Sequence, residues 1–164
     1  MKSFVFFTLL FFSLNGFGQH AKLTRAQEDS LAKNFTPSPG KAIVYIIRPS
    51  IMAAAIEMRL DCDSFFVGWI NPKTYLFTVL DSGDHIFIAK SENKSTLKIH
   101  VDGGQKYYLE QDAKMGIMYA RTKLRLITPE EGIKYLSKYL ISRQNNYPLL
   151  TYSTNVVEPS FENQ

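Results

Sequence analysis

The sequence has few of the residues on which cross-links and metal centres depend. Cys62 is the only cysteine among 164 residues, so the chain can form no internal disulfide and has no Cys-x-x-Cys redox motif. Only three histidines accompany it, and they are scattered along the sequence. Zinc requires three or four Cys, His or carboxylate ligands at suitable spacing. The sequence therefore predicts neither a disulfide framework nor a metal centre.

A nucleophile elbow and a complete calcium-binding loop are also missing. There is no Gly-x-Ser-x-Gly nucleophile elbow. Asp61 and Asp63 resemble the start of a calcium loop, but Phe66 stands where that loop needs glycine and Pro72 where it needs an acid. Aspartates in such a segment favour turns, so we interpret this pair as turn residues. We predict no catalytic residue and no cofactor.

Long apolar runs are confined to the amino-terminal end. Residues 4–14 are almost all apolar and follow Lys2, while Gly16 and Gly18 stand at the spacing typical of a signal-peptidase site. A transmembrane helix needs about 20 apolar residues, which this run does not reach. No cysteine follows it to accept a lipid. We predict a signal peptide over residues 1–19 and a periplasmic or secreted protein; a retained membrane anchor is the alternative.

Neither sign of charge is strongly in excess. Nineteen Lys and Arg against fifteen Asp and Glu give a formal net charge of +4. The nearest approach to a basic cluster is Arg121, Lys123 and Arg125, which would share one face of a strand. A solvated face is the simpler interpretation, and an anion or polysaccharide contact through Arg121 is the alternative. Nucleic acid is not expected as a partner, because there is no basic helix or long positive stripe.

The sequence predicts mostly short β-strands, and residues 80–112 form the middle hairpins of the predicted domain. Between residues 95 and 102 apolar and polar residues alternate, which indicates a strand with one wet face. Asp81-Ser82-Gly83 and Asp102-Gly103-Gly104 suit tight hairpin turns. Further strands are expected at residues 42–47, 56–61, 65–70, 74–80, 86–89, 106–110, 117–120 and 124–127. This spacing predicts an antiparallel β-sandwich of about seven to nine strands.

Two helices are expected beside the strands. Thr24 and Gln27 fit a capping box inside a polar linker over residues 20–40, and so short a helix should be loosely held or disordered. Thr128 and Pro129 predict the start of a C-terminal helix over residues 129–142. Its buried stripe should contain Ile133, Leu136 and Leu140. The domain would then span residues 41–142, followed by a flexible tail over residues 143–164.

The order and spacing of several short segments resemble a known family. The segments are Ala42 to Pro49, Asp61 before Val67-Gly68, Gly83-Asp84-His85, Gly104 to Leu109, and Leu124 to Ile127 followed by Glu131-Gly132. Over roughly residues 41–140 they resemble the bacterial envelope family catalogued as domain of unknown function 2846. Two departures stand out. Cys62 replaces a turn glycine, and the lipid-acceptor cysteine of many members is missing.

This resemblance implies a fold and a location but no activity. The glycine turns are also similar to those of surface β-domains with a Pro-Glu-Gly-Ala signature, which points to a prealbumin-like sandwich. Because the family has no assigned activity, the resemblance names no substrate, cofactor or catalytic residue.

Candidate contact residues come from the aromatic and basic side chains. Trp69, Tyr75, Tyr107 and Tyr108 either pack against neighbouring strands or form a face on which sugars stack. Arg48, at the end of a buried strand, needs a carboxylate or carbonyl partner, and an anchoring role is the simpler interpretation. The candidate ligand contacts are therefore Arg48, Trp69, Tyr108 and Arg121.

The histidines and the cysteine have ordinary structural interpretations. His85 is expected to cap a turn through backbone hydrogen bonds, and His100 to be solvated. His20 lies at the processed terminus. Cys62 is expected to be a buried, inert thiol; exposure in the hairpin loop is the alternative.

These observations favour a non-catalytic, exported envelope module that binds an unknown protein or glycan. Carbohydrate or peptidoglycan binding is the first alternative and a hydrolase the second. A hydrolase should show a cleft that joins His85 or His100 to a carboxylate and a nucleophile. We expect a monomer without a stable membrane span after processing.

Overall fold

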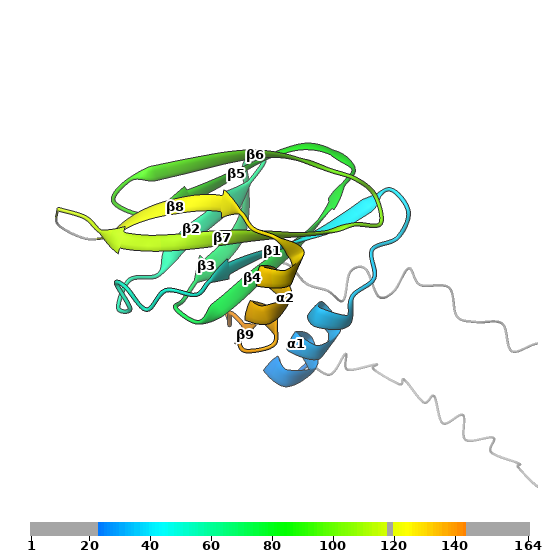
Figure 1. Cartoon of the computed structure of the whole chain (residues 1–164), viewed down its shortest axis with the longest axis horizontal. Helices are drawn as coiled ribbons and strands as arrows, with labels where there is room; N and C mark the ends of the chain where they lie inside the picture. The colour runs from blue at the N-terminus through cyan, green and yellow to red at the C-terminus, as the bar shows by residue number, and fades with distance from the viewer. Residues whose placement is uncertain (1–22, 118–119, 144–164) are drawn as a thin grey trace, which may run out of the picture.

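The chain folds as three layers, in which two β-sheets face each other and two helices cover one of them (Figure 1). The computed structural model describes residues 23–117 and 120–143. The predicted signal peptide, His20 and the predicted tail from residue 144 onward lie outside the described residues. Neither described helix has the length and apolar character that crossing a membrane requires.

The helix-covered sheet contains five strands, in the order β8 (Ala120–Leu126), β7 (Lys106–Met115), β1 (Lys41–Arg48), β4 (Thr74–Asp81) and β9 (Leu140–Ile141). The exposed sheet contains four strands, in the order β3 (Phe65–Ile70), β2 (Met58–Cys62), β5 (Gly83–Lys90) and β6 (Lys94–Val101). The helices are α1 (Arg25–Asn34) and α2 (Pro129–Leu136). The predicted mainly β sandwich with a C-terminal helix is confirmed.

Two strand pairs depart from the predicted antiparallel arrangement. Strand β1 pairs in parallel with β7, and β4 pairs in parallel with β9, whereas the other ladders are antiparallel. Parallel neighbours need a long connection between them. The entire exposed sheet lies between β1 and β7 in the sequence, and helix α2 leads the chain to β9.

Strand β1 is buried on both faces, as its continuous apolar sequence predicts. Ala42, Val44 and Ile46 face the exposed sheet and join the core between the two sheets. Ile43, Tyr45 and Ile47 face the helices and join a second core that includes residues of α1 and α2. The helix-covered sheet therefore separates two cores, and the exposed sheet has one buried face only.

Helix α1 forms where the capping box predicts it, but it is not loosely held. The Thr24 hydroxyl accepts a hydrogen bond from the Gln27 amide, and the Gln27 side chain accepts one from the Thr24 amide. Asp29 is buried and accepts hydrogen bonds from the Tyr75 hydroxyl at 2.9 Å and the Ile141 amide at 2.8 Å. Tertiary bonds thus supply the stability that so short a helix lacks alone.

Helix α2 begins as predicted but is shorter than expected. The Thr128 hydroxyl caps it, and it ends at Leu136 instead of residue 142 because Leu140 and Ile141 join β4 as strand β9. The predicted buried stripe is also wrong for Ile133 and Leu140, which are exposed. The prediction is confirmed for Leu136, which is buried against the sheet together with Gly132, and a Cβ at Gly132 would overlap the ring of Tyr108.

Side chains join the two sheets along both edges. From the β5–β6 hairpin, Asn93 and Ser95 bond to the backbone of β8 at Thr122 and Leu124. At the other edge, the Ser142 hydroxyl donates to the Trp69 carbonyl at 2.9 Å. These bonds fix the exposed sheet over the core and leave its outer face to solvent.

Candidate functional site

The exposed sheet has two shallow pockets, which we call the histidine pocket and the tryptophan pocket. Residues on β5 and β6 alternate between inward and outward positions, so every second side chain reaches the outer face. His85 and Ile99 alternate with these outward residues, so the histidine pocket includes side chains from both sides of the sheet at its end. Both helices lie on the far side of the molecule (Figure 1). The face therefore combines polar and apolar side chains that no described helix covers.

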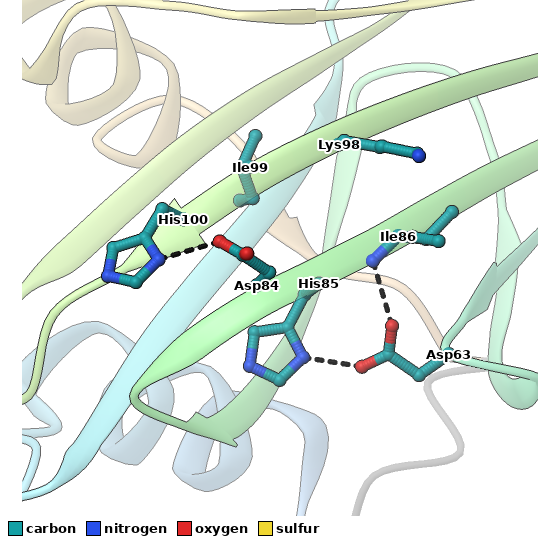
Figure 2. A pocket seen from close by; sticks show the side chains of 7 residues that line it. All are labelled: Asp63, Asp84, His85, Ile86, Lys98, Ile99 and His100. Carbon is teal, nitrogen blue, oxygen red and sulfur yellow. Dashed lines mark hydrogen bonds and ion pairs between the residues drawn. The ribbon is translucent and has the colours of Figure 1, made fainter.

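The histidine pocket has a volume of about 430 Å³ and lies over the starts of β5 and the β2–β3 turn. Figure 2 shows two histidine–aspartate pairs within it, His85 with Asp63 and His100 with Asp84. The ammonium group of Lys98 points away from both imidazole rings (Figure 2). The remaining lining residues are Ile86 and Ile99.

His85 is held at both ring nitrogens. Its Nδ1 lies against Asp63 Oδ2, and its Nε2 lies 2.8 Å from the Asp81 carbonyl oxygen. Both neighbours are acceptors, so both bonds form only when the two nitrogens carry protons. Partial burial lowers the pKa of His85, but the bonds to Asp63 and Asp81 outweigh it, and the pKa is raised. The predicted turn-capping role is confirmed by the bond to Asp81.

The surroundings of Asp63 favour its ionised form, as those of His85 favour the protonated ring. It stands in the β2–β3 turn with φ 47°, where Ser64 also has positive φ, and its Oδ1 accepts from the Ile86 amide at 2.8 Å. Burial raises the pKa of Asp63, yet the bonds from His85 and Ile86 prevail and lower it. The interpretation of Asp63 as a turn residue is confirmed.

The second pair is more open to solvent. His100 Nδ1 lies 2.6 Å from Asp84 Oδ1, and both side chains are exposed, as predicted for a solvated histidine. Asp84 and His100 are direct partners across the β5–β6 ladder, so the ladder itself places them together.

Cys62 lies beneath the first pair. The thiol is buried, which confirms the preferred interpretation, and it continues the inward series of Met58 and Leu60. Burial, reinforced by the Asp63 carboxylate, raises the pKa of the Cys62 thiol to about 12. A thiol of this kind is a poor nucleophile at neutral pH.

The tryptophan pocket has a volume of about 320 Å³ and lies across β3, β2 and the end of β5. Trp69 is 37% exposed and packs edge-on against Phe66 with ring centres 6.0 Å apart. The guanidinium of Arg59 lies 4.7 Å from the centre of the Phe66 ring. The other lining residues are Ile56, Glu57, Lys90, Ser91 and Glu92.

Asp61 holds the two cations of this pocket in place. Arg59 donates from Nε to Asp61 at 2.8 Å, and Lys90 Nζ lies 2.7 Å from the same carboxylate. Burial raises the pKa of Asp61, but the bonds from Arg59 and Lys90 outweigh it and the pKa is lowered. Asp61 lies within strand β2 rather than in a turn, so its interpretation as a turn residue is wrong. A β-bulge in the β2–β3 ladder falls between Leu60 and Asp61.

One similar protein was identified by sequence. An uncharacterised protein of Haemophilus influenzae is 30% identical over 118 residues, which are 71% of this chain and 70% of that protein. No family model matches the chain. The chain belongs to the family of this Haemophilus protein.

The four residues that the sequence singled out in this family member do not form one site. Arg48 is fully buried and donates to the carbonyls of Met52, Ala53, Ile56 and Ile70, which is the anchoring role. Tyr108 is buried and stacks on Tyr45. Neither side chain is accessible to a ligand, so both are excluded as contacts.

Arg121 and Trp69 lie on different sheets. Arg121, Lys123 and Arg125 are exposed along β8 as the alternation predicts, and Arg125 pairs with Glu110 at 2.6 Å. Of the predicted contacts, Trp69 is the one that lies in a pocket described here.

Sequence reasoning missed the partners that complete these pockets. His85 is 22 residues from Asp63, and Lys90 is paired with Arg59 only through the β2–β5 ladder. No local spacing signals such pairs, since they depend on strand register. Arg59 is different, because its outward position was readable from the alternation around Met58 and Leu60.

Proposed function

We propose that this protein is a non-catalytic, exported binding module of the bacterial cell envelope, and that it binds carbohydrate, peptidoglycan included, in the tryptophan pocket. The observation that carries the proposal is the partly exposed Trp69 ring among charged side chains on the uncovered sheet. An apolar ring suits the C–H face of a sugar, and neighbouring polar groups suit its hydroxyls.

The charged groups around Trp69 support this ligand class. The side chains of Arg59 and Lys90 are 41% and 47% exposed although each is bonded to Asp61. They therefore have donor positions that face solvent, while Glu57 and Glu92 contribute carboxylates to the same pocket. A glycan with hydroxyl and acidic groups would find both donors and acceptors there.

The histidine pocket supports a non-catalytic role over a hydrolase. It joins both histidines to carboxylates, but the described residues that line it include no serine, threonine or cysteine. A general base needs a nitrogen lone pair, and both nitrogens of His85 face acceptors. The thiol of Cys62 below it has a pKa of about 12. Among the described residues that line this pocket there is thus no serine, threonine or cysteine nucleophile, and His85 has no free nitrogen to act as a base.

Two further parts of the proposal come from the sequence. Export rests on the apolar run of residues 4–14 and the glycines after it. Membership of the family named domain of unknown function 2846 rests on the segments between residues 41 and 140. Mass spectrometry of the protein from its native cells tests export, since a periplasmic chain that begins near residue 20 is expected.

Glycan binding can be tested with a matched pair of aromatic variants. Wild-type protein is applied to a glycan array and to isolated peptidoglycan, together with Trp69→Ala and Phe65→Ala. Phe65 is on the same strand and 77% exposed but lies outside the pocket. Loss of a stacking ring costs about 1–3 kcal/mol, so Trp69→Ala should weaken binding about 5-fold or more while Phe65→Ala retains it.

Two outcomes would contradict the carbohydrate proposal. One is a wild-type protein that binds no glycan on the array and no peptidoglycan. The other is equal binding by wild type and Trp69→Ala, which would place the ligand elsewhere on the surface.

A further inference from the structure

Three potential metal ligands converge where β2 ends and β5 begins. One ligand atom from each of Cys62, Asp63 and His85 lies within 4.8 Å of the other two. Cys62 is the last residue of β2, Asp63 follows in the turn, and β5 brings His85 beside them. Figure 2 shows the His85 ring directed at the Asp63 carboxylate. We call these residues the Cys62–Asp63–His85 cluster.

The backbone orients the two solvent-side members through their other atoms. His85 Nε2 lies 2.8 Å from the Asp81 carbonyl oxygen, which leaves Nδ1 directed into the cluster. Asp63 Oδ1 accepts from the Ile86 amide at 2.8 Å, which leaves Oδ2 directed at Nδ1. Metal-bound histidines and carboxylates are oriented in this way, by second hydrogen bonds to backbone groups or carboxylates. These second bonds are in place without a metal, and an ion would bind by separating Nδ1 from Oδ2, which now contact each other directly.

The cluster also has the layout of a site that is closed on one side and open on the other. Cys62 supplies its sulfur from the core, where it is buried among apolar residues. Asp63 and His85 also line the histidine pocket, which opens to solvent. An ion would therefore enter from the pocket, and its remaining position would face water there.

From this geometry we propose that Cys62, Asp63 and His85 bind a divalent transition metal ion of the zinc class, through Cys62 Sγ, Asp63 Oδ2 and His85 Nδ1. Zinc accepts mixed sulfur, nitrogen and oxygen ligands in tetrahedral geometry, and three protein ligands leave one position for water. Calcium and magnesium prefer sets of oxygen ligands, so a thiolate disfavours both.

Binding of the metal ion requires no other reactant, because the ion only displaces protons. The ion replaces the proton between His85 Nδ1 and Asp63 Oδ2 and the proton of the Cys62 thiol, and both protons leave to solvent. The Asp81 carbonyl keeps its bond from Nε2–H. The proposal is independent of carbohydrate binding, because Trp69 and Arg59 line the other pocket.

Cobalt titration of the untagged protein tests the proposal directly. Co²⁺ bound to a thiolate gives a sulfur-to-metal charge-transfer band in the near ultraviolet, and Cys62 is the only source of that sulfur. The band should appear at one equivalent of Co²⁺ and disappear when Zn²⁺ is added. Mg²⁺ and Ca²⁺ should leave it unchanged. A protein that shows no such band with excess Co²⁺ overturns the proposal, whatever the variants do.

Three variants then assign the other ligands. His85→Gln and Asp63→Asn should weaken Zn²⁺ binding about 100-fold or more in a chromophoric chelator competition, because each removes a ligand. His100→Gln is the matched control, since it removes a histidine from the same pocket but outside the cluster. Circular dichroism establishes that each variant is folded. Unchanged affinity in His85→Gln, or an equal loss in His100→Gln, overturns the assignment.

Discussion

Asp29 and Asp61 are both almost fully buried, yet they lie on opposite sides of the molecule and have different partners. Asp29, on α1, is bonded to the Tyr75 hydroxyl and the Ile141 amide, both buried, and to Lys33 at 2.7 Å. Asp61, on the exposed sheet, is bonded to Arg59 and Lys90, whose side chains reach solvent. One carboxylate joins three elements of the fold, and the other positions two charges at the surface.

The difference between these acids shows how each face is used. On the helix-covered side, polar groups are satisfied by other parts of the chain, so the helices fix the fold. On the exposed sheet, the Asp61 carboxylate holds two cations whose other donor positions face solvent, and this is the side where both pockets lie. A buried acid therefore stabilises the fold on the helix-covered side, whereas on the exposed sheet it positions charged side chains at the surface.

The largest expected effect is a contrast in stability between the two aspartates. Asp29→Ala should lower the free energy of unfolding by about 3 kcal/mol, because it leaves the buried Ile141 amide without its acceptor and the buried Tyr75 hydroxyl with only the Asp29 carbonyl at 3.4 Å. Asp61→Ala should cost only about 1 kcal/mol, since water can solvate the exposed ends of Arg59 and Lys90. Urea denaturation followed by tryptophan fluorescence measures both values.

Asp29→Asn is the control for charge. Its side-chain oxygen still accepts from Tyr75 and Ile141, so the loss should be below about 1 kcal/mol and reflect the ion pair with Lys33. If Asp29→Ala and Asp61→Ala prove equally destabilising, the contrast between the two faces is wrong.

Local sequence signals predicted most of the fold. Alternation located most of the strands, continuous apolar sequence marked β1 as buried on both faces, and Thr128 located the start of α2. The strand expected at residues 117–120 is wrong, because β7 continues to Met115, Ile117 is exposed outside any strand, and β8 begins only at Ala120. These local signals could not show where contacts with distant parts of the chain override the local pattern. Pairing of residues 140–141 with β4 ends the helical pattern early, and Asp29 anchors a helix whose own hydrophobic pattern is weak.

The candidate sites were less predictable, because they depend on register between distant strands. Trp69 was identified by residue type alone, and the structure adds Arg59 and Lys90 beside it. Cys62 and His85 were each considered alone in the sequence. Only the β2–β5 ladder, in which Cys62 pairs with Phe87, brings the start of β5 close to the thiol.

A second, smaller effect is expected at the cap of α2, on the helix-covered side. Thr128→Ala should lower the free energy of unfolding by about 1 kcal/mol, because the Glu131 amide loses its acceptor. Thr128→Ser keeps the hydroxyl and should stay close to wild type. Thermal melting of the three proteins is the measurement, and an unchanged midpoint in Thr128→Ala would show that the cap does not hold the helix.

The smallest effect concerns pH and the exposed sheet. The pKa of His85 is raised above its usual 6.5, so its contribution to stability is complete below pH 6.5 and is lost as pH rises through the folded-state value. The pKa of Asp63 is lowered below its usual 3.8, so its contribution is present above pH 3.8 and is lost as pH falls through the folded-state value. The pair therefore stabilises the fold most between about pH 3.8 and 6.5.

His85→Gln isolates the histidine contribution above about pH 5, because titrating groups that do not contact His85 cancel in its difference from wild type and Asp63 is already ionised there. With a chelator present to exclude metal, the difference in unfolding free energy should be largest near pH 5 and decrease toward pH 9. It should stay below about 1 kcal/mol, as for ion pairs near the surface. His100→Gln, whose pair with Asp84 is exposed, should show a smaller difference across the same range. A difference for His85→Gln that grows with pH would mean that the ring is neutral in the folded protein and that only one of its two bonds exists.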